Sequence, residues 1–137
     1  MTLDHRRGHL TRAILEASAF AVRHVAQPIL AAGVAVDEMR VCGGPARSEL
    51  WNQVKADVTG FRVAVPAVLE TAVVGAAALG ATGIGAYSDL PAAIRGMTSV
   101  ARRLEPRPEY RDRYDAAFDA YVRLHPAIAP ILAGLRP

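Results

Sequence analysis

The sequence predicts an α/β fold, and two observations support that prediction. Segments with the three-to-four spacing of amphipathic helices alternate with short β-branched runs, in the order helix, strand, helix, strand, helix, with extra helices towards the C-terminus. This alternation is typical of parallel strands covered by helices. With 137 residues, 52% of them hydrophobic, the chain is long enough for one domain with a substantial core.

Composition narrows the classes of function. The net charge of +3 comes from arginines spread along the chain, and a nucleic-acid-binding surface would need them clustered among aromatic residues. The histidines His5, His9 and His24 lack the spacing and the acidic or cysteine partners of a zinc site. The single cysteine, Cys42, fits a reducing cytoplasm, and residues 1–10 precede no apolar run of the signal-peptide kind. We therefore expect a cytoplasmic protein without nucleic-acid, membrane or metal binding.

The first element is a helix that starts near Leu10. Pro28 lies inside its pattern and predicts a kink or fraying near Ala26, and Gly33 is a plausible terminator. Arg12, Glu16 and Arg23 are expected to face outward, opposite an apolar face. That face comprises Leu10, Ile14, Leu15, Ala17, Ala21, Val22, Val25 and Ile29.

The stretch from Met39 to Val65 is the place to look for function. A short strand, Met39 to Cys42, leads through the turn Gly43-Gly44-Pro45 into a helix that begins near Ala46. Glycines between a strand and a helix let another group approach the backbone closely, which is a recurring way to bind a nucleotide. Taken alone, the pattern also fits an ordinary tight turn.

The helix after this turn is expected to lie on a sheet. Its apolar face carries Leu50, Trp51, Val54 and Val58, and Glu49, Gln53 and Lys55 are expected to face away. Gly60 should close this helix. The second strand, Arg62 to Val65, is halted by Pro66.

The remaining elements are mostly helical. Residues 70–86 predict a buried helix whose small residues pack closely on a neighbour, and this run is too short and too rich in Ala and Gly to span a membrane. A short helix follows at Leu90 to Met97, with Ser88 or Asp89 as N-cap and Pro91 in its first turn. Arg102 to Pro108 is expected to be an extended connection. A last helix, Tyr110 to Leu124, docks through its aromatic face and ends at Pro126.

Several motifs, in order along almost the whole chain, resemble the C-terminal part of the FGGY carbohydrate kinases, most closely the xylulokinase-like branch. The matching segments are Leu3-Asp4-His5-Arg6, Arg12-Ala13-Ile14-Leu15-Glu16, Gly43-Gly44-Pro45-Ala46-Arg47-Ser48, Leu50-Trp51-Asn52-Gln53, Ala56-Asp57-Val58 with Gly60, Glu70-Thr71-Ala72 with Gly75-Ala76-Ala77, and Tyr114 with Tyr121. The resemblance implies a partial actin-like, ribonuclease-H-like domain. In that family the three strands that open the C-terminal domain would precede this chain.

The resemblance implies that the glycine turn belongs to an adenosine pocket. Carried over by position, the residues lining ATP are Gly43, Gly44, Ala46 and Ser48, with Asn52 one helical turn further on. Pro45 departs from the glycine or alanine common in the family. It removes one backbone N–H and fixes φ, which puts any contact that needs that donor in doubt.

The resemblance also implies what this chain lacks for catalysis. Residues 1–137 correspond to a segment of the ATP-binding C-terminal domain, and the N-terminal sugar and phosphate domain, with an Asp-x-Gly-Thr loop and a catalytic aspartate, is expected upstream of Met1. No residue here matches that aspartate, and any Mg²⁺ bound with ATP would take its ligands elsewhere. Phosphoryl transfer depends on positioning and electrostatics around the transferred group, so the isolated chain should be inactive.

Three classes of function remain open from the sequence. The first is the nucleotide-binding segment of an ATP-dependent sugar kinase, as a fragment or as one subunit of a split enzyme that meets the sugar only through its other half. The second is a non-catalytic interaction or oligomerisation module that uses an open sheet edge. The third is an unrelated basic module for anionic ligands. A neighbouring reading frame with Asp-x-Gly-Thr would favour a split kinase, and the uncovered apolar faces favour a homodimer.

Overall fold

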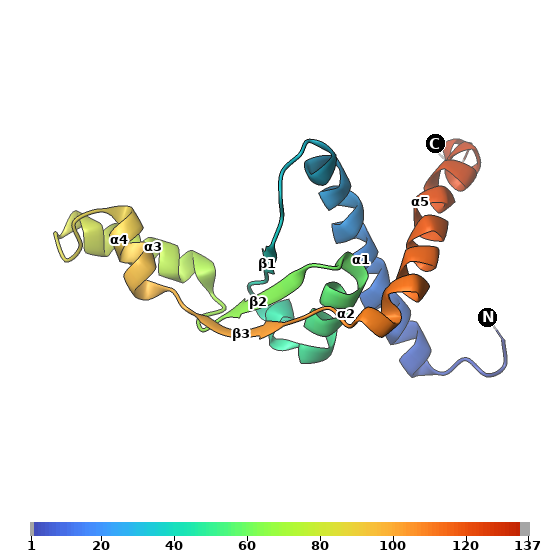
Figure 1. Cartoon of the computed structure of the whole chain (residues 1–137), viewed down its shortest axis with the longest axis horizontal. Coiled ribbons are helices and arrows are strands. Elements are labelled where there is room, and N and C mark those ends of the chain that lie inside the picture. Colours follow the sequence, from blue (N-terminus) through green and yellow to red (C-terminus); the bar gives the residue numbers. More distant parts are fainter. Residues whose placement is uncertain (1, 135–137) are drawn as a thin grey trace.

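The computed structural model describes residues 2–134 and contains a small mixed sheet, three helices packed together on one side of it, and a helical arm (Figure 1). The elements follow in the order α1 (Arg7–Ala31), β1 (Glu38–Arg40), the 3₁₀ turn η1 (Gly44–Arg47), α2 (Glu49–Thr59), β2 (Arg62–Pro66), α3 (Thr71–Gly83), α4 (Leu90–Met97), β3 (Val100–Leu104), the 3₁₀ turn η2 (Pro108–Tyr110) and α5 (Arg111–Ala133). The predicted order of helix, strand, helix, strand, helix is confirmed.

The sheet has three strands in the order β1-β2-β3. β1 runs parallel to β2, with Met39 opposite Val63, and β3 runs antiparallel to β2, with Arg103 opposite Ala64. The expectation that Arg102 to Pro108 forms only an extended connection is wrong for its first part, which belongs to β3. This strand shows little apolar alternation because its arginines are exposed and pair with Glu38 and Glu49 instead.

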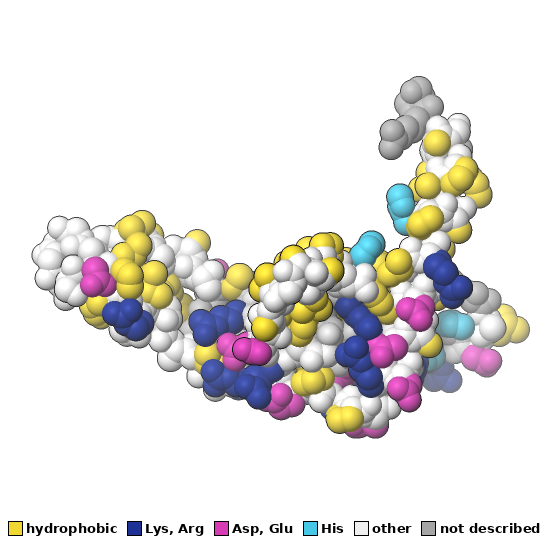
Figure 2. All heavy atoms as spheres, turned by 45° about the horizontal axis from the view of Figure 1, so that its top comes forward, with side chains coloured by type: hydrophobic (Ala, Val, Ile, Leu, Met, Phe, Trp, Pro, Cys, Tyr) yellow, Lys and Arg dark blue, Asp and Glu magenta, His cyan; other side chains and the backbone are white. Residues whose placement is uncertain are grey.

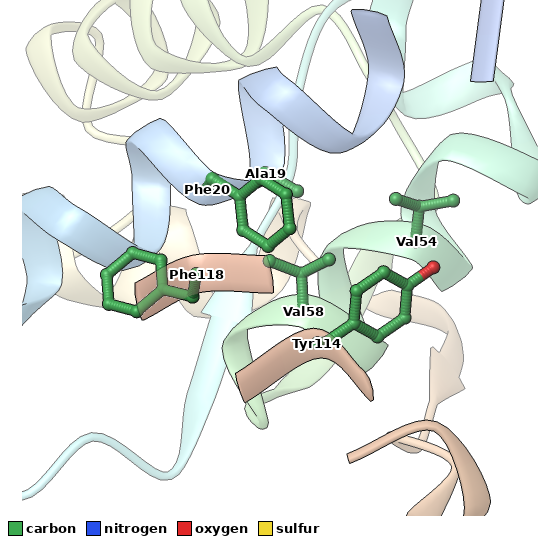
Figure 3. Packing of buried hydrophobic residues seen from close by; sticks show 6 residues of the cluster. All are labelled: Ala19, Phe20, Val54, Val58, Tyr114 and Phe118. Atoms are coloured by element: carbon green, nitrogen blue, oxygen red, sulfur yellow. The ribbon is translucent and has the colours of Figure 1, made fainter. Parts of the chain in front are cut away.

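One core lies between α1, α2 and α5 (Figure 3). Phe20 from α1 packs against the rings of Tyr114 and Phe118 from α5, with centroid separations of 6.2 and 6.1 Å. Val54 and Val58 close the cluster from α2. The aromatic docking face predicted for the last helix is confirmed at Tyr114 and Phe118.

The inward face of α1 is opposite to the predicted one. Arg12, Glu16 and Arg23 face α5, where Arg12 Nη2 donates to the Tyr114 hydroxyl at 2.6 Å and Arg23 pairs with Asp115 at 2.6 Å. Most of the predicted apolar face is exposed: Ile14 is 69% and Val25 is 70% exposed. Both faces of α1 have helical spacing. The face that carries Arg12, Glu16 and Arg23 is turned inward because Phe20 lies on the same face and packs against the aromatic rings of α5.

A second core fixes α2 on the sheet. Val41, Ala46, Ala56, Val63, Val65 and Leu104 form this cluster. The face predicted for α2 is correct at Val54 and Val58 but wrong at Leu50, which is exposed, and at Lys55, which is buried. Contacts on several sides of α2, from α1, α5 and the sheet, explain why a single amphipathic face describes it poorly.

Helices α3 and α4 form an arm that projects from the end of the sheet (Figure 1). α3 packs against α4, but only Ala78 of α3 is buried. The prediction of a buried helix over residues 70–86 is therefore wrong in this structure. Only Asp89 and Arg95 are charged between residues 71 and 97, and Figure 2 shows an arm surface with few charged side chains.

Prolines interrupt fewer helices than expected. Pro28 lies inside α1, and Pro126 and Pro130 lie inside α5, so the predictions of fraying near Ala26 and of a helix end at Pro126 are wrong. A proline removes one helical hydrogen bond but keeps a helical φ, and these helices continue past it. The glycine predictions are confirmed: Gly33 and Gly60 adopt left-handed conformations with φ of 82° and 76° after α1 and α2.

Candidate functional site

The turn after β1 is tied to the segment that follows β2. Val41 N donates to Ala64 O at 3.1 Å, which extends the pairing of the two strands by one residue. Gly43 N donates to Leu69 O at 2.8 Å, and Gly43 has φ of 69° and ψ of −166°. A side chain at such a positive φ is strained, so this position requires glycine. Together these bonds fix where the glycine backbone lies relative to the strand ends.

A 3₁₀ turn stands between these glycines and α2, where the sequence predicted a helix beginning near Ala46. Ala46 N donates to Gly43 O at 3.1 Å, and Ser48 N donates to Pro45 O at 3.2 Å. Pro45 lies in the first positions of η1, where a backbone N–H has no partner within the turn. Its missing donor therefore costs the local fold nothing.

Ser48 and Asn52 complete the turn from the side of α2. Ser48 caps α2, and its Oγ accepts from Trp51 N at 3.3 Å. Asn52 is completely buried, and its Nδ2 donates to Ala46 O at 2.7 Å. The five predicted site residues thus form one unit: Gly43, Gly44 and Ser48 reach solvent, while Ala46 and Asn52 lie beneath them.

A cavity of about 620 Å³ opens at the strand ends, beside Cys42 and thus one residue before this turn. Its walls come from β1, β2, α3, α4 and β3. The lining residues are Arg40, Val41, Cys42, Ala64, Pro66, Thr71, Ile94, Arg95, Thr98, Ser99 and Val100. None of the five predicted residues lines it, so the turn forms the rim beside the cavity and not its wall.

An apolar recess of about 190 Å³ adjoins this cavity, between α3 and α4. The two share Pro66, Thr71, Ile94, Thr98 and Ser99. The recess reaches deeper along the arm, to Val68, Val74, Gly75 and Met97. A cavity with a few polar groups that leads into an apolar slot is a common shape for small-molecule sites.

The cavity carries positive charge and no carboxylate. Arg40 and Arg95 line it, while Arg40 Nε pairs with Glu38 at 3.1 Å and Arg95 has no ion pair within residues 2–134. Lys55 of α2 does not line the cavity; its burial lowers its pKa, and the nearby Cys42 partly counteracts this. This electrostatic character suits an anionic ligand.

Sequence reasoning missed the contribution of α4 and β3 to this cavity. Arg95, Thr98 and Ser99 lie about fifty residues beyond the glycine turn, and no motif in the sequence marks them. They reach the site only because β3 pairs antiparallel with β2, which brings the α4–β3 junction back to the strand ends. The sequence analysis therefore failed to predict β3 and this wall of the cavity for the same reason.

Residues 2–134 hold neither a cluster of metal ligands nor a helix that could span a membrane. Between residues 2 and 134, no group of three or more histidine, cysteine, aspartate or glutamate side chains is arranged to hold a metal ion. Over the same residues, no helix is long and apolar enough to cross a bilayer.

Solved sugar kinases share this architecture. A xylulose kinase from Rhodospirillum rubrum superimposes with a TM-score of 0.74 at 26% identity, over 96% of this chain and 27% of that one. The structure therefore corresponds to part of the actin-like α/β fold of sugar kinases. Residues 1–84 match the model for the C-terminal domain of the FGGY family of carbohydrate kinases, and the chain belongs to this family.

Curated relatives agree with this assignment. A ribulokinase from Mycolicibacterium smegmatis is 37% identical over 90% of this chain and 22% of its own length. A probable L-xylulose kinase from Pasteurella multocida is 33% identical over 96% of this chain and 26% of its own length. The chain thus spans about a quarter of the length of these relatives.

Proposed function

We propose that this chain is the adenine-nucleotide-binding part of an ATP-dependent, xylulokinase-like sugar kinase. In this proposal the turn binds ATP, and the sugar and the catalytic base are supplied by the remainder of such an enzyme. The relatives named as ribulokinase and L-xylulose kinase support a ketose as the class of acceptor. ATP with Mg²⁺ is the expected phosphoryl donor of this reaction.

The observation that carries the proposal is the exposed glycine backbone of Gly43 and Gly44 beside a positively charged cavity. Without side chains, these residues let a ribose or phosphate lie against the main chain. Ser48 offers a hydroxyl at the start of α2, where the helix dipole favours an anion. Ala46 and Asn52 are buried and support this surface from beneath. The recess between α3 and α4 has room for an apolar base edge.

Catalysis needs groups that this sequence does not contain. It has no Asp-x-Gly-Thr segment and no aspartate that corresponds to the base of the family. Since phosphoryl transfer depends on positioning around the γ-phosphate, we expect no turnover of pentuloses or glycerol by residues 1–137 alone. We also assign no Mg²⁺ ligand to them.

NMR titration of the chain with ATP and with adenosine tests the nucleotide assignment. Both ligands should shift the amides of residues 43–52, with affinity no better than about millimolar, or roughly 4 kcal/mol, since only part of the phosphate site is present. Gly43→Ala should weaken the shifts because it strains a residue with φ of 69°. Gly33→Ala is the matched control, since Gly33 also has a positive φ, of 82°, but lies in the turn after α1 and lines neither the cavity nor the recess.

Two results of this titration would contradict the assignment. If a folded wild-type protein shows no shift in residues 43–52 with either ligand, the adenosine assignment is wrong. If Gly33→Ala weakens binding as much as Gly43→Ala, the effect reflects general destabilisation and the turn loses its special role.

A second candidate function is an interaction module, and one observation favours it. β1 pairs only with β2 among residues 2–134, so its other edge is open, and Ile14 and Val25 leave an apolar stripe on α1 exposed. An open strand edge is suited to pairing with another strand, and an exposed apolar helix face is suited to packing against a partner. This candidate predicts association without any effect of nucleotide.

A further inference from the structure

The amide of Asn52 is buried beneath the glycine turn. Its side chain has no exposed surface, and Nδ2 donates to Ala46 O at 2.7 Å. Ala46 is itself only 1% exposed, and its backbone N donates to Gly43 O at 3.1 Å. A chain of two hydrogen bonds therefore connects the interior of α2 to the first glycine.

The other half of this amide is unpaired. Asn52 Oδ1 has no hydrogen-bond partner within residues 2–134, although it is fully buried. An unpaired buried acceptor destabilises a fold relative to an apolar side chain of the same shape. The bond to Ala46 is therefore the one hydrogen bond that the Asn52 side chain makes within residues 2–134.

Within residues 2–134, the turn is held by its own 3₁₀ hydrogen bonds, by the packing of Ala46 in the second core, and by few hydrogen bonds from outside the turn. Gly43 and Gly44 have wide backbone freedom, and Pro45 has no N–H to donate. The ion pair between Arg47 and Glu70, at 3.3 Å, is exposed on both sides and contributes little. Besides the bond from Gly43 N to Leu69 O, Asn52 supplies the anchor that reaches the turn from the protein interior.

We propose that Asn52 is a positioning residue for the nucleotide turn. Its Nδ2–H donates to the Ala46 carbonyl and thereby fixes the position of the Gly43 and Gly44 backbone relative to α2, where the ligand would contact it. Asn52 does not touch the nucleotide. This inference rests on the proposed nucleotide-binding function of the turn and adds how the turn is held in shape.

Asn52→Leu removes the donor and the unpaired oxygen together and keeps the branching of the side chain at Cγ. It should change the ligand-free amide shifts of residues 43–48, speed their hydrogen exchange, and weaken ATP binding at least threefold. Because the buried Ala46 carbonyl loses its donor, the melting temperature should fall as well. Gln53→Leu is the matched control, since its neighbouring amide binds Asp57 and Glu105 O at 2.9 Å instead. It should lower the melting temperature and leave residues 43–48 unchanged.

The Asn52 side chain of the wild-type protein reports its own hydrogen bonding directly, without a substitution. The Asn52 side-chain NH₂ resonances should show slow exchange without nucleotide and should not move when ATP is added. Fast exchange in the ligand-free protein, or a large shift on ATP binding, would overturn the positioning role. So would an Asn52→Leu protein with wild-type turn shifts and ATP affinity.

The failure of this inference is distinguishable from failure of the proposed function. If ATP binds nowhere on the folded wild type, the nucleotide function is wrong, while the ligand-free shifts and exchange rates still report whether Asn52 holds the turn. If Asn52→Leu does not fold, Asn52→Ala and the wild-type exchange measurement decide the question.

Discussion

At the scale of single residues, α2 contains two buried charged side chains, of which Asp57 has an ion-pair partner and Lys55 has none within residues 2–134. The Asp57 side chain is fully buried and accepts hydrogen bonds from Gln53 Nε2 and from Arg107, through its backbone N at 2.9 Å and its Nη2 at 2.7 Å. Lys55 is 8% exposed and has no ion pair or hydrogen bond from Nζ within residues 2–134; Nζ lies 4.5 Å from the ring centroid of Trp51. A buried charge is tolerated when it is paired and destabilising when it is not.

Removing the partner of Asp57 should be costly. Arg107→Ala leaves a buried carboxylate without its cation, and we expect a loss of about 3 kcal/mol in the free energy of unfolding, measured by urea denaturation. Arg102→Ala is the matched control. Arg102 also pairs with an acid on α2, but Glu49 is 73% exposed there, so the loss should stay below about 1 kcal/mol. Equal losses for the two variants would show that burial of the carboxylate does not matter.

Lys55 should make stability depend on alkaline pH. Burial lowers the pKa of Lys55, so in the interval below the ordinary lysine value the unfolded chain binds more protons than the folded one. Stability then rises with pH in that interval. Lys55→Met should therefore be more stable than the wild type at pH 7, and the difference should shrink as pH rises to about 11. A difference that stays constant over this range in urea denaturation would contradict the assignment.

At the scale of elements, the arm of α3 and α4 departs most from the prediction. The Ala- and Gly-rich helix was expected to pack closely, so that a larger side chain at Gly75 would overpack it. In the structure, a Cβ added at Gly75 meets no atom within 4 Å. Gly96 in α4 is the opposite case, since a Cβ there would lie 2.8 Å from the Tyr87 ring. The arm is therefore open on the side of α3 and tight where Tyr87 covers α4.

Gly75→Ala should stabilise the protein. Gly75 lies in the interior of α3 with ordinary helical φ, so alanine reduces the entropy of the unfolded chain and should add about 0.5–1 kcal/mol to the free energy of unfolding. Gly96→Ala, the control in α4, should give no such gain because Tyr87 must move. A melting temperature lowered by Gly75→Ala would show that the face is covered in solution, as the sequence alone suggested.

At the scale of the whole molecule, exposed apolar surface is the dominant feature. Leu10, Ile14 and Val25 of α1 and Val73 and Leu79 of α3 are all well exposed, and Figure 2 shows hydrophobic side chains over both the arm and the long helices. Apolar area of this extent in a domain usually marks an interaction surface. The open edge of β1 adds unpaired backbone groups to it.

We predict that the purified chain self-associates at micromolar concentration, most simply as a twofold dimer. Sedimentation equilibrium measures this directly. Ile14→Glu places a charge in the apolar stripe of α1 and should weaken association, whereas Gln27→Glu, an equal charge at an exposed polar position of the same helix, should not. A well-folded wild-type monomer at that concentration would contradict the prediction.

Local features of this protein could be read from the sequence with good accuracy. The order of its first elements, the glycine turn after β1, and the left-handed glycines after α1 and α2 follow from spacing and from the conformations that only glycine adopts readily. The N-cap of α4 is Asp89, whose Oδ1 accepts from Ala92 N at 2.7 Å, again as expected. These features depend on interactions between residues close in the chain.

What the sequence by itself determined was therefore the α/β class, the FGGY relationship and the turn that carries Gly43. Tertiary structure alone decided which face of α1 is buried, that Arg102 and Arg103 belong to a strand, and that α4 and β3 form a wall of the cavity. The physical reason is that α1 offers two faces of helical spacing and β3 has little apolar pattern. Only contacts between segments far apart in the chain distinguish such alternatives.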